Sequence, residues 1–145
     1  MNKTHTKYLM PALIALIMML SGNIETAAQA QAISTDEMSE LDEYPAFRRG
    51  LSGIHDFIAK NMRYPLEPYR MNMEGRVVVR FVVSKTGKVK GVEVIEKSVH
   101  PDLDKEAVRI VKAMPKWKPG ILNGEPVDVY YTQPFVFKIP PPRHP

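Results

Sequence analysis

The spacing of apolar side chains changes along the chain and predicts helices and strands in turn. From Leu51 to Met62 apolar residues recur every three or four positions, which is typical of an amphipathic helix, and Ser52 is available as its cap. From Arg76 to Ile95 they alternate with other residues on either side of a turn that contains Gly87, which predicts a β-hairpin. We expect one face of its first strand to be deeply buried and the other, where valines alternate with arginines, to be only partly covered.

A second helix and a last strand follow the hairpin. Pro101 suits a first helical turn, an apolar stripe follows it, and Pro115 should end the helix. From Val127 to Ile139 the alternation of a strand returns, but Pro134 interrupts it. A proline within a strand favours an edge position or a bulge, so we expect this strand at the edge of the sheet.

The order of helix, hairpin, helix and strand defines an α+β unit of about 95 residues. We predict a small three-stranded antiparallel sheet, made of the hairpin and a C-terminal edge strand, packed by one helix and joined by an additional N-terminal helix. Residues 64–73 and 116–126 are expected to be irregular connections. Trp117, Phe135 and Phe137 are expected in the core, because large aromatic side chains usually contribute burial.

The first 30 residues have the pattern of a secretory signal. Lys3 and Lys7 precede an apolar run of about 13 residues, and Ala28 and Ala30 supply small residues at cleavage spacing. A permanent membrane helix needs about 20 apolar residues. We therefore expect cleavage after Ala30 or Ala32 and a periplasmic protein, with an uncleaved inner-membrane anchor and a periplasmic domain as the alternative.

Composition and charge narrow the picture further. The 145 residues include no cysteine, which excludes disulfides, thiolate metal sites and a cysteine nucleophile. The formal net charge is +4, but Asp36 to Glu43 holds five acids and no base, so Tyr44 to Pro145 carries 18 bases and 10 acids, or +8. Such a surface can attract acidic partner segments or an anionic membrane surface, or can serve solubility alone. An exported protein is not expected to meet nucleic acid.

Nothing in the sequence points to catalysis. The four histidines form no ligand cluster with acids at metal spacing, and no GxSxG motif occurs. Asp102 and Asp104 are accounted for by the positive end of the helix dipole. We predict that the protein is not an enzyme and binds no metal or cofactor.

Several motifs in order resemble the C-terminal domain family of TonB energy transducers, over roughly residues 44–139. They are Tyr64-Pro65, the strand from Glu74 to Val83, the helix start from His100 to Asp104, and the segment from Met114 to Gly120. The resemblance is to the form that has an additional helix before Tyr64-Pro65. It implies a periplasmic domain that binds the N-terminal box of outer-membrane receptors. These receptors import iron complexes, vitamins or glycans.

The resemblance also implies a route for binding, in which a receptor segment adds a strand to the exposed sheet edge through main-chain hydrogen bonds. The candidate edge is the last strand, and the segment after Tyr64-Pro65 supplies weaker candidates. The predicted partner-binding residues are Val127, Asp128, Val129, Tyr130, Tyr131, Thr132, Tyr69 and Arg70.

The chain departs from complete transducers of this family. Its N-terminal apolar run has no histidine or charged side chain that would serve a proton-driven motor, and residues 31–45 would span at most about 50 Å. We expect a signal peptide or short anchor at 1–30, an acidic flexible lead at 31–46, the TonB-like domain at 47–139 and a proline-rich tail at 140–145. A standalone TonB-like domain fits these features, and inner-membrane motor proteins become partners only if the chain is anchored.

Two alternatives remain open at the level of sequence. In the first alternative, the domain is a structural or regulatory module that does not transduce energy. It binds another envelope protein, or forms a homodimer, through the same strand edge. A weaker alternative is a binder of anionic surfaces driven by charge alone.

Overall fold

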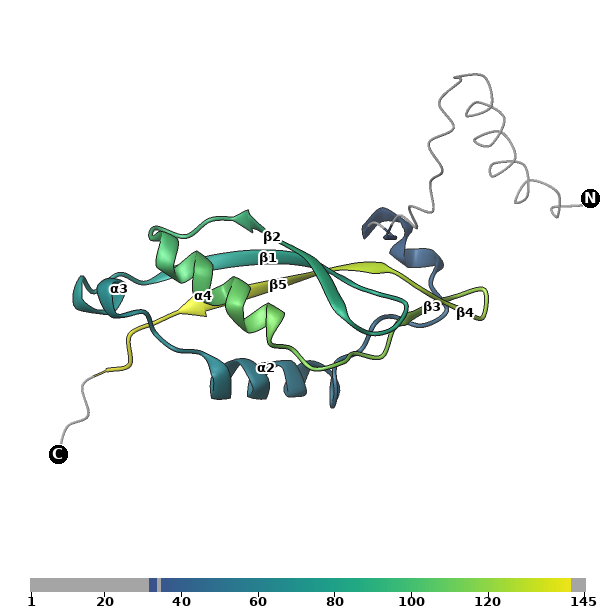
Figure 1. Cartoon of the computed structure of the whole chain (residues 1–145), viewed down its shortest axis with the longest axis horizontal. Coiled ribbons are helices and arrows are strands. Elements are labelled where there is room, and N and C mark those ends of the chain that lie inside the picture. The colour runs from purple at the N-terminus through teal and green to yellow at the C-terminus, as the bar shows by residue number, and fades with distance from the viewer. Residues whose placement is uncertain (1–31, 34, 142–145) are drawn as a thin grey trace, which may run out of the picture. The chain divides into compact units, whose positions relative to one another are not determined.

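The computed structural model describes residues 32, 33 and 35–141, so the predicted signal and its cleavage lie outside the described residues. One 3₁₀ helix, three α-helices and five strands occur within this range (Figure 1). In chain order they are η1 (Thr35–Glu40), α2 (Gly50–Asn61), α3 (Leu66–Arg70), β1 (Gly75–Val83), β2 (Val89–Glu96), α4 (Pro101–Lys112), β3 (Gly120–Leu122), β4 (Glu125–Val127) and β5 (Val129–Phe137).

The main sheet has three antiparallel strands in the order β2, β1, β5. The pairing of β1 with β5 is unbroken, from Gly75 opposite Phe137 to Val83 opposite Val129. The pairing of β1 with β2 contains two register shifts. The predicted sheet is therefore confirmed, with the first strand of the hairpin at its centre.

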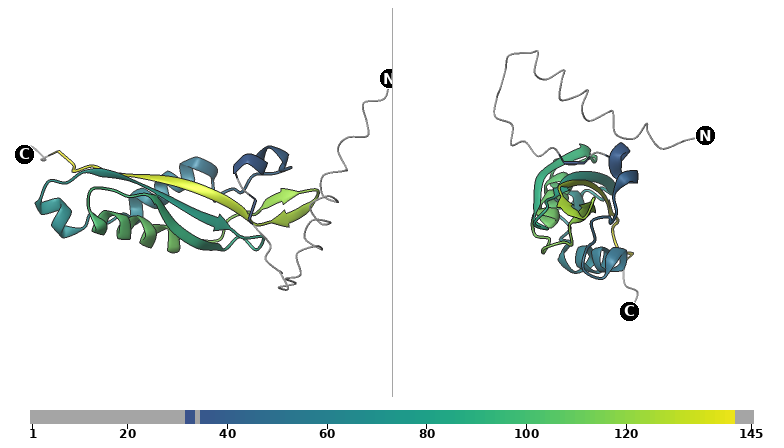
Figure 2. Two further views of the ribbon diagram at one scale, coloured as in Figure 1. Left: turned by 90° about the horizontal axis from the view of Figure 1, so that it is seen from above. Right: turned by 90° about the vertical axis from the view of Figure 1, so that its right-hand side faces the viewer.

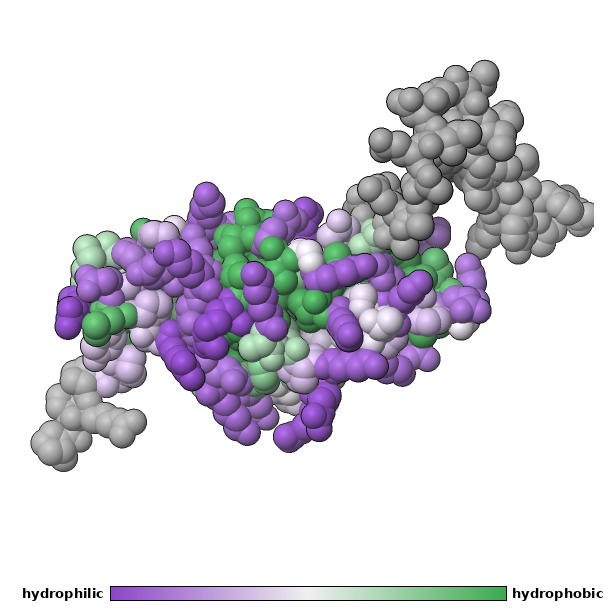
Figure 3. Space-filling model, in the orientation of Figure 1, coloured by the Kyte–Doolittle hydropathy of each residue, from purple (hydrophilic) through white to green (hydrophobic). Residues whose placement is uncertain are grey.

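The core lies between the sheet and α4, and α2 runs alongside β5 (Figures 1 and 2). Figure 3 shows hydrophilic residues over most of the face that carries α4 and a hydrophobic area near its middle. His100 caps α4, since its Nδ1 accepts a hydrogen bond from the Asp102 amide at 3.1 Å. The fully buried side chains come from all of these elements: Val77, Val79, Phe81 and Val83 of β1, Leu103 and Ile110 of α4, Phe135 and Phe137 of β5, and Ile54 of α2.

The opposite face of β1 is better covered than the sequence predicts. Val78 and Val82 are both buried there, although they alternate with arginines. Arg80 forms an ion pair with Glu93 of β2 and lies 5.1 Å from the ring centre of Tyr130 on β5. Its side chain thus spans the three strands and shields the valines, because a long cationic side chain can cover apolar surface while its head stays in water.

Three local predictions are wrong. Residues 66–70, predicted to be irregular, form α3, and residues 120–127 form the β3–β4 hairpin around Asn123 and Gly124, whose φ angles are 51° and 78°. Positive φ at both positions suits the two-residue turn that Asn-Gly favours. Ser52 does not cap α2. The helix begins after Arg49, whose backbone angles lie in the left-handed region. The Ser52 hydroxyl instead donates to the Arg49 carbonyl at 2.9 Å.

Part of the predicted acidic lead forms backbone hydrogen bonds with β3 and the residues before it. The Asp42 amide donates to the Ile121 carbonyl at 2.8 Å, and Ala46 and Lys118 exchange amide-to-carbonyl bonds at 3.0 and 2.8 Å. Leu41 is buried, and Glu43 pairs with the Lys118 ammonium at 2.5 Å. Residues 41–46 are thus tied to the domain by their main chain.

Candidate partner-binding edge

Strand β5 is an edge strand of the sheet in the part of the chain that the structure describes, and one side of it pairs with β1. On its other side, Ile33 makes a single parallel bridge near the start of the strand. The Ile33 amide donates to the Asp128 carbonyl at 2.8 Å, and the Tyr130 amide donates to the Ile33 carbonyl at 3.1 Å. The main-chain groups of Asp128 and Tyr130 therefore point away from β1.

This contact fixes which later main-chain groups of β5 are directed outward. Amide and carbonyl groups alternate between the two sides of an antiparallel strand, so those of Thr132, Pro134 and Val136 also point away from β1. All three residues are exposed, whereas Gln133 and Phe135 between them are buried. Pro134 lies on the outward side, where its missing N–H removes no hydrogen bond from the β1–β5 ladder, and this explains why an uninterrupted strand tolerates it.

The other edge of the sheet, β2, is less suited to accept a further strand. Its pairing with β1 shifts register twice, and Gly91 within it has a φ of 58°. Three of its residues, Lys90, Glu93 and Glu96, carry charge and form ion pairs within the domain. Bulges and charged side chains are common protections of sheet edges against further pairing. The regular edge is therefore β5.

A groove of about 430 Å³ lies between α2 and the second half of β5. The α2 side consists of helix residues three and four positions apart, which places them on one face of the helix, and of Met62, which follows the last residue of the helix. The β5 side consists of four consecutive residues that follow Thr132. The lining residues are His55, Ile58, Ala59, Met62, Gln133, Pro134, Phe135 and Val136.

The structure separates the predicted binding residues of the last strand. Val127 belongs to β4, and Val129 is fully buried in the domain. Tyr131 is half-buried against Phe81 and Trp117, and burial raises the pKa of its hydroxyl. Of the others on this strand, Tyr130 has its amide bonded to Ile33 and Thr132 is exposed with its amide directed outward.

Asp128 is held inside the domain by its own contacts. Its carboxylate accepts a hydrogen bond from the Lys85 amide at 2.7 Å and pairs with the Lys90 ammonium at 2.5 Å. Burial acts to raise the pKa of this carboxyl, but the two bonds outweigh burial and the pKa lies below its ordinary value. Asp128 therefore joins the β1–β2 turn region to the start of β5 and presents no free carboxylate to a partner.

Tyr69 and Arg70 lie on α3, toward the other end of β5. The ring of Tyr64 stands edge-on to Tyr69 and to Phe137, with both ring-centre distances 5.9 Å. Arg70 is exposed and lies 3.6 Å from the Glu67 carboxylate. The eight predicted residues thus do not form one cluster. The sequence reasoning missed Pro134, Val136 and the α2 stripe, although the apolar spacing of that helix was a signal that it has a face to cover.

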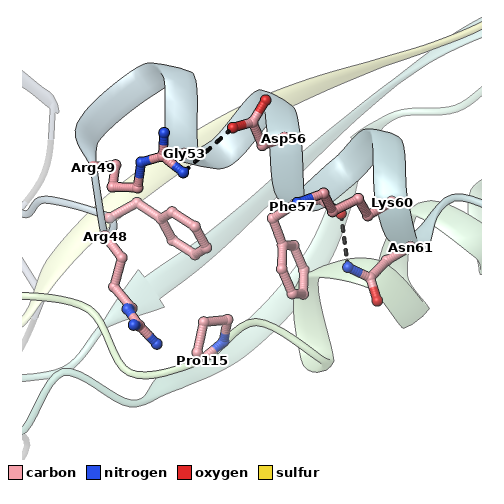
Figure 4. Close-up of a pocket in the computed structure, with 9 residues that line it drawn as sticks. Arg48, Arg49, Gly53, Asp56, Phe57, Lys60, Asn61 and Pro115 are labelled. Atoms are coloured by element: carbon pink, nitrogen blue, oxygen red, sulfur yellow. Dashed lines mark hydrogen bonds and ion pairs between the residues drawn. The ribbon is translucent and has the colours of Figure 1, made fainter.

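A second hollow of about 260 Å³ lies beside the start of α2 (Figure 4). Its lining includes three cationic residues, Arg48, Arg49 and Lys60, and one acidic residue, Asp56. The Asp56 carboxylate lies 3.8 Å from the Arg49 guanidinium. Phe57 and other apolar side chains complete it. This hollow suits an anionic group, but it contains no pairing of nucleophile and base.

Two kinds of feature are absent from the described residues. Residues 32, 33 and 35–141 contain no group of three or more side chains placed to hold a metal ion. Within the same residues, no helix has the length and apolar character that crossing a membrane requires.

Comparison with protein family models identifies one family. Residues 60–139 match the model of the C-terminal domain of the Gram-negative bacterial TonB protein. No curated protein sequence matches the chain. An NMR structure of the Helicobacter pylori TonB C-terminal domain is 22% identical, with a TM-score of 0.48, over 62% of this chain and 80% of that one. The Pseudomonas aeruginosa TonB C-terminal domain is 28% identical, with a TM-score of 0.43, over 57% of this chain and 85% of that one.

Proposed function

Because the chain belongs to the TonB C-terminal domain family, we propose that it is a periplasmic domain that binds outer-membrane TonB-dependent receptors by strand addition to β5. Domains of this family are non-enzymatic, and in TonB proteins they interact with outer-membrane receptors. The proposal extends this role to energy-dependent transport of iron complexes, vitamins or glycans.

The observation that carries the proposal is the outward direction of the main-chain groups in the second half of β5. Thr132 and Val136 each have an amide and a carbonyl directed away from β1, and no described residue pairs with their amides. An extended segment laid along this side would complete a fourth strand. Each main-chain hydrogen bond contributes about 0.5–1.5 kcal/mol, so the edge supplies register and a share of the affinity.

The proposed site is narrower than the one that the sequence indicates. We place the receptor segment along Thr132 to Val136, past the stretch that Ile33 covers. Tyr69 and Arg70 would meet a segment only if it extends beyond the end of β5 toward α3.

The test is a calorimetric titration of the full-length chain with a receptor N-terminal box peptide, at low and at moderate salt. Thr132→Pro removes one outward amide while leaving the β1–β5 ladder intact, and Thr132→Val is the matched control because it keeps the amide and the branched shape. We expect Thr132→Pro to weaken binding about fivefold and Thr132→Val to change it little.

A second peptide, methylated on alternate backbone nitrogens, tests the same hydrogen bonds from the partner's side. It should lose binding while its side chains stay the same. The proposal fails if neither Thr132→Pro nor backbone methylation affects binding, or if moderate salt abolishes it, because those results indicate attraction by charge alone.

The same edge would serve the alternative in which a second copy of the chain pairs along β5. Sedimentation of the wild type and of Thr132→Pro separates the two. A dimer that dissociates in the variant, without any receptor peptide binding in the wild type, favours self-association.

A further inference from the structure

We infer that the groove between α2 and β5 is a side-chain pocket that selects partner segments carrying one large apolar residue level with Phe135. This inference rests on the proposed strand addition and names the chemistry of the segment that would bind. The occupant is an extended segment of another protein, neutral or acidic in charge, with a leucine-sized or larger apolar side chain at that position.

The main-chain edge has a gap at the level of the groove. Pro134 has no amide to donate, and its carbonyl already accepts a hydrogen bond from Gln133 Nε2 at 2.8 Å. A strand added here would pair with Thr132 and Val136 but find fewer main-chain partners between them. Side chains should therefore contribute more of the binding at this level, and the groove is lined on the strand side by Gln133 to Val136.

The direction of side chains on an added strand brings them to the groove. Side chains directly opposite each other on neighbouring strands lie on the same face of the sheet. Gln133 and Phe135 are buried on the face that packs on the core, which is the side where α2 lies. A partner residue opposite Phe135 would thus point toward α2, and its two neighbours would point away from it.

The lining of the groove determines which side chain it favours. Ile58 and Ala59 of α2, and Met62 directly after it, line the groove with carbon and sulfur atoms. The side-chain nitrogen of Gln133 donates to the Pro134 carbonyl, which leaves the side-chain oxygen of Gln133 and the His55 ring as the polar groups of a mostly apolar lining. The volume of about 430 Å³ falls within the 300–1,000 Å³ that is usual for ligand pockets, and a methionine adapts to different shapes.

The net charge of the domain determines which charges the partner segment can carry on either side of its apolar residue. Residues 41–141, which include the part of the acidic lead that hydrogen-bonds to the domain, carry 17 bases and 12 acids, a net charge of +5, and Arg48 and Lys60 make no ion pair within the described part of the chain. An acidic or neutral segment is therefore attracted and a basic one repelled. Apolar contact in the groove supplies selectivity that such long-range attraction lacks.

The experiment is a position scan of a receptor N-terminal box peptide, in which each residue in turn becomes leucine or alanine. Binding is measured with the wild type, with Ala59→Trp, which fills the groove from α2, and with Ala113→Trp, the same change at an exposed position after α4. Amide shifts of Thr132 and Val136 report strand addition, and methyl shifts of Ile58 and Met62 report the groove.

We expect one peptide position at which leucine binds about tenfold more tightly than alanine. Ala59→Trp should abolish that difference, and Ala113→Trp should keep it. If the edge amides shift but no position shows the preference, or if Ala59→Trp leaves it unchanged, the groove inference is overturned while strand addition stands. If none of the peptides shifts the amides of Thr132 and Val136, the proposed function fails as well.

Discussion

The amide of Tyr130 donates to the carbonyl of Ile33 across 3.1 Å, on the side of β5 that faces away from the sheet. The chain therefore covers the start of its own free edge with a residue nearly a hundred positions earlier in the sequence. A partner strand that extends along the whole of β5 must displace Ile33, whereas one confined to Thr132 to Val136 does not.

Replacing Ile33 with proline tests this coverage. The change removes the amide that donates to the Asp128 carbonyl, so the bridge should open and the Tyr130 amide should exchange with solvent faster. Hydrogen exchange followed by NMR measures this directly, and Ile33→Val is the control because it keeps the amide. Unchanged exchange of the Tyr130 amide in Ile33→Pro would show that the bridge does not protect the edge.

The three strands of the main sheet and the two long helices could be predicted from sequence because their apolar spacing is local. The missed elements are short and are encoded differently. Pro65 and Pro68 suggested an irregular segment, yet they occupy the start of α3, where helical amides need no partner. Asn123-Gly124 is a strong two-residue turn signal, but the three-residue strands beside it are too short to show a period.

The candidate site could be predicted only in part, for a different reason. Pro134 correctly indicated an edge strand. A strand tolerates a proline where the missing N–H lies on the side that has no neighbouring strand. The role of Asp128 depends on Lys85 and Lys90, which lie about 40 positions away, and the cover over Tyr130 depends on the isolated bridge of Ile33. Such pairings arise from tertiary structure and leave no periodic trace in the sequence.

Glu106 joins α4 to the end of α2, and its replacement should make stability less dependent on pH. Its carboxylate accepts hydrogen bonds from the Arg63 amide at 2.7 Å and from Arg109 Nε and Nη2 at 2.8 and 2.7 Å, and Arg109 Nη2 also donates to the Asn61 carbonyl at 2.7 Å. Burial acts to raise the pKa of Glu106, but these bonds outweigh it and the pKa lies below its ordinary value.

A lowered pKa in the folded state means that the carboxylate stabilises the fold above the ordinary glutamate pKa of about 4.3 and loses this effect as pH falls through the folded value. We expect Glu106→Gln to cost about 1–2 kcal/mol at neutral pH and little in acid. Urea unfolding at several pH values measures this. Glu67→Gln is the control, since its ion pair with Arg70 is exposed, and an equal loss in both variants would contradict the prediction.

Gly87 and Gly124 form a matched pair for testing close packing in a turn. Both have positive φ, 83° and 78°, so alanine is strained at either position by about 1 kcal/mol. A β-carbon at Gly87 would also lie 2.2 Å from the Trp117 carbonyl oxygen, whereas one at Gly124 would meet nothing within 4 Å. Gly87→Ala should therefore destabilise the domain clearly more than Gly124→Ala in denaturant unfolding, and equal losses would exclude the clash.

Trp117 offers a test of a buried polar atom without a partner. Its ring packs against Phe47, Phe81 and Tyr131, with ring centres 5.1, 5.7 and 4.8 Å away, and its Nε1 is buried with no hydrogen-bond acceptor among the described residues. Trp117→Ala should cost about 3–5 kcal/mol, because it leaves a large cavity. Trp117→Phe should cost much less, since it keeps most of the aromatic contact and removes an indole N–H whose unsatisfied burial costs about 1–3 kcal/mol. Circular dichroism during urea unfolding is the suitable measurement, because either variant removes the chain's one tryptophan. A loss in Trp117→Phe as large as that in Trp117→Ala would mean that Nε1 donates to an acceptor in the folded protein.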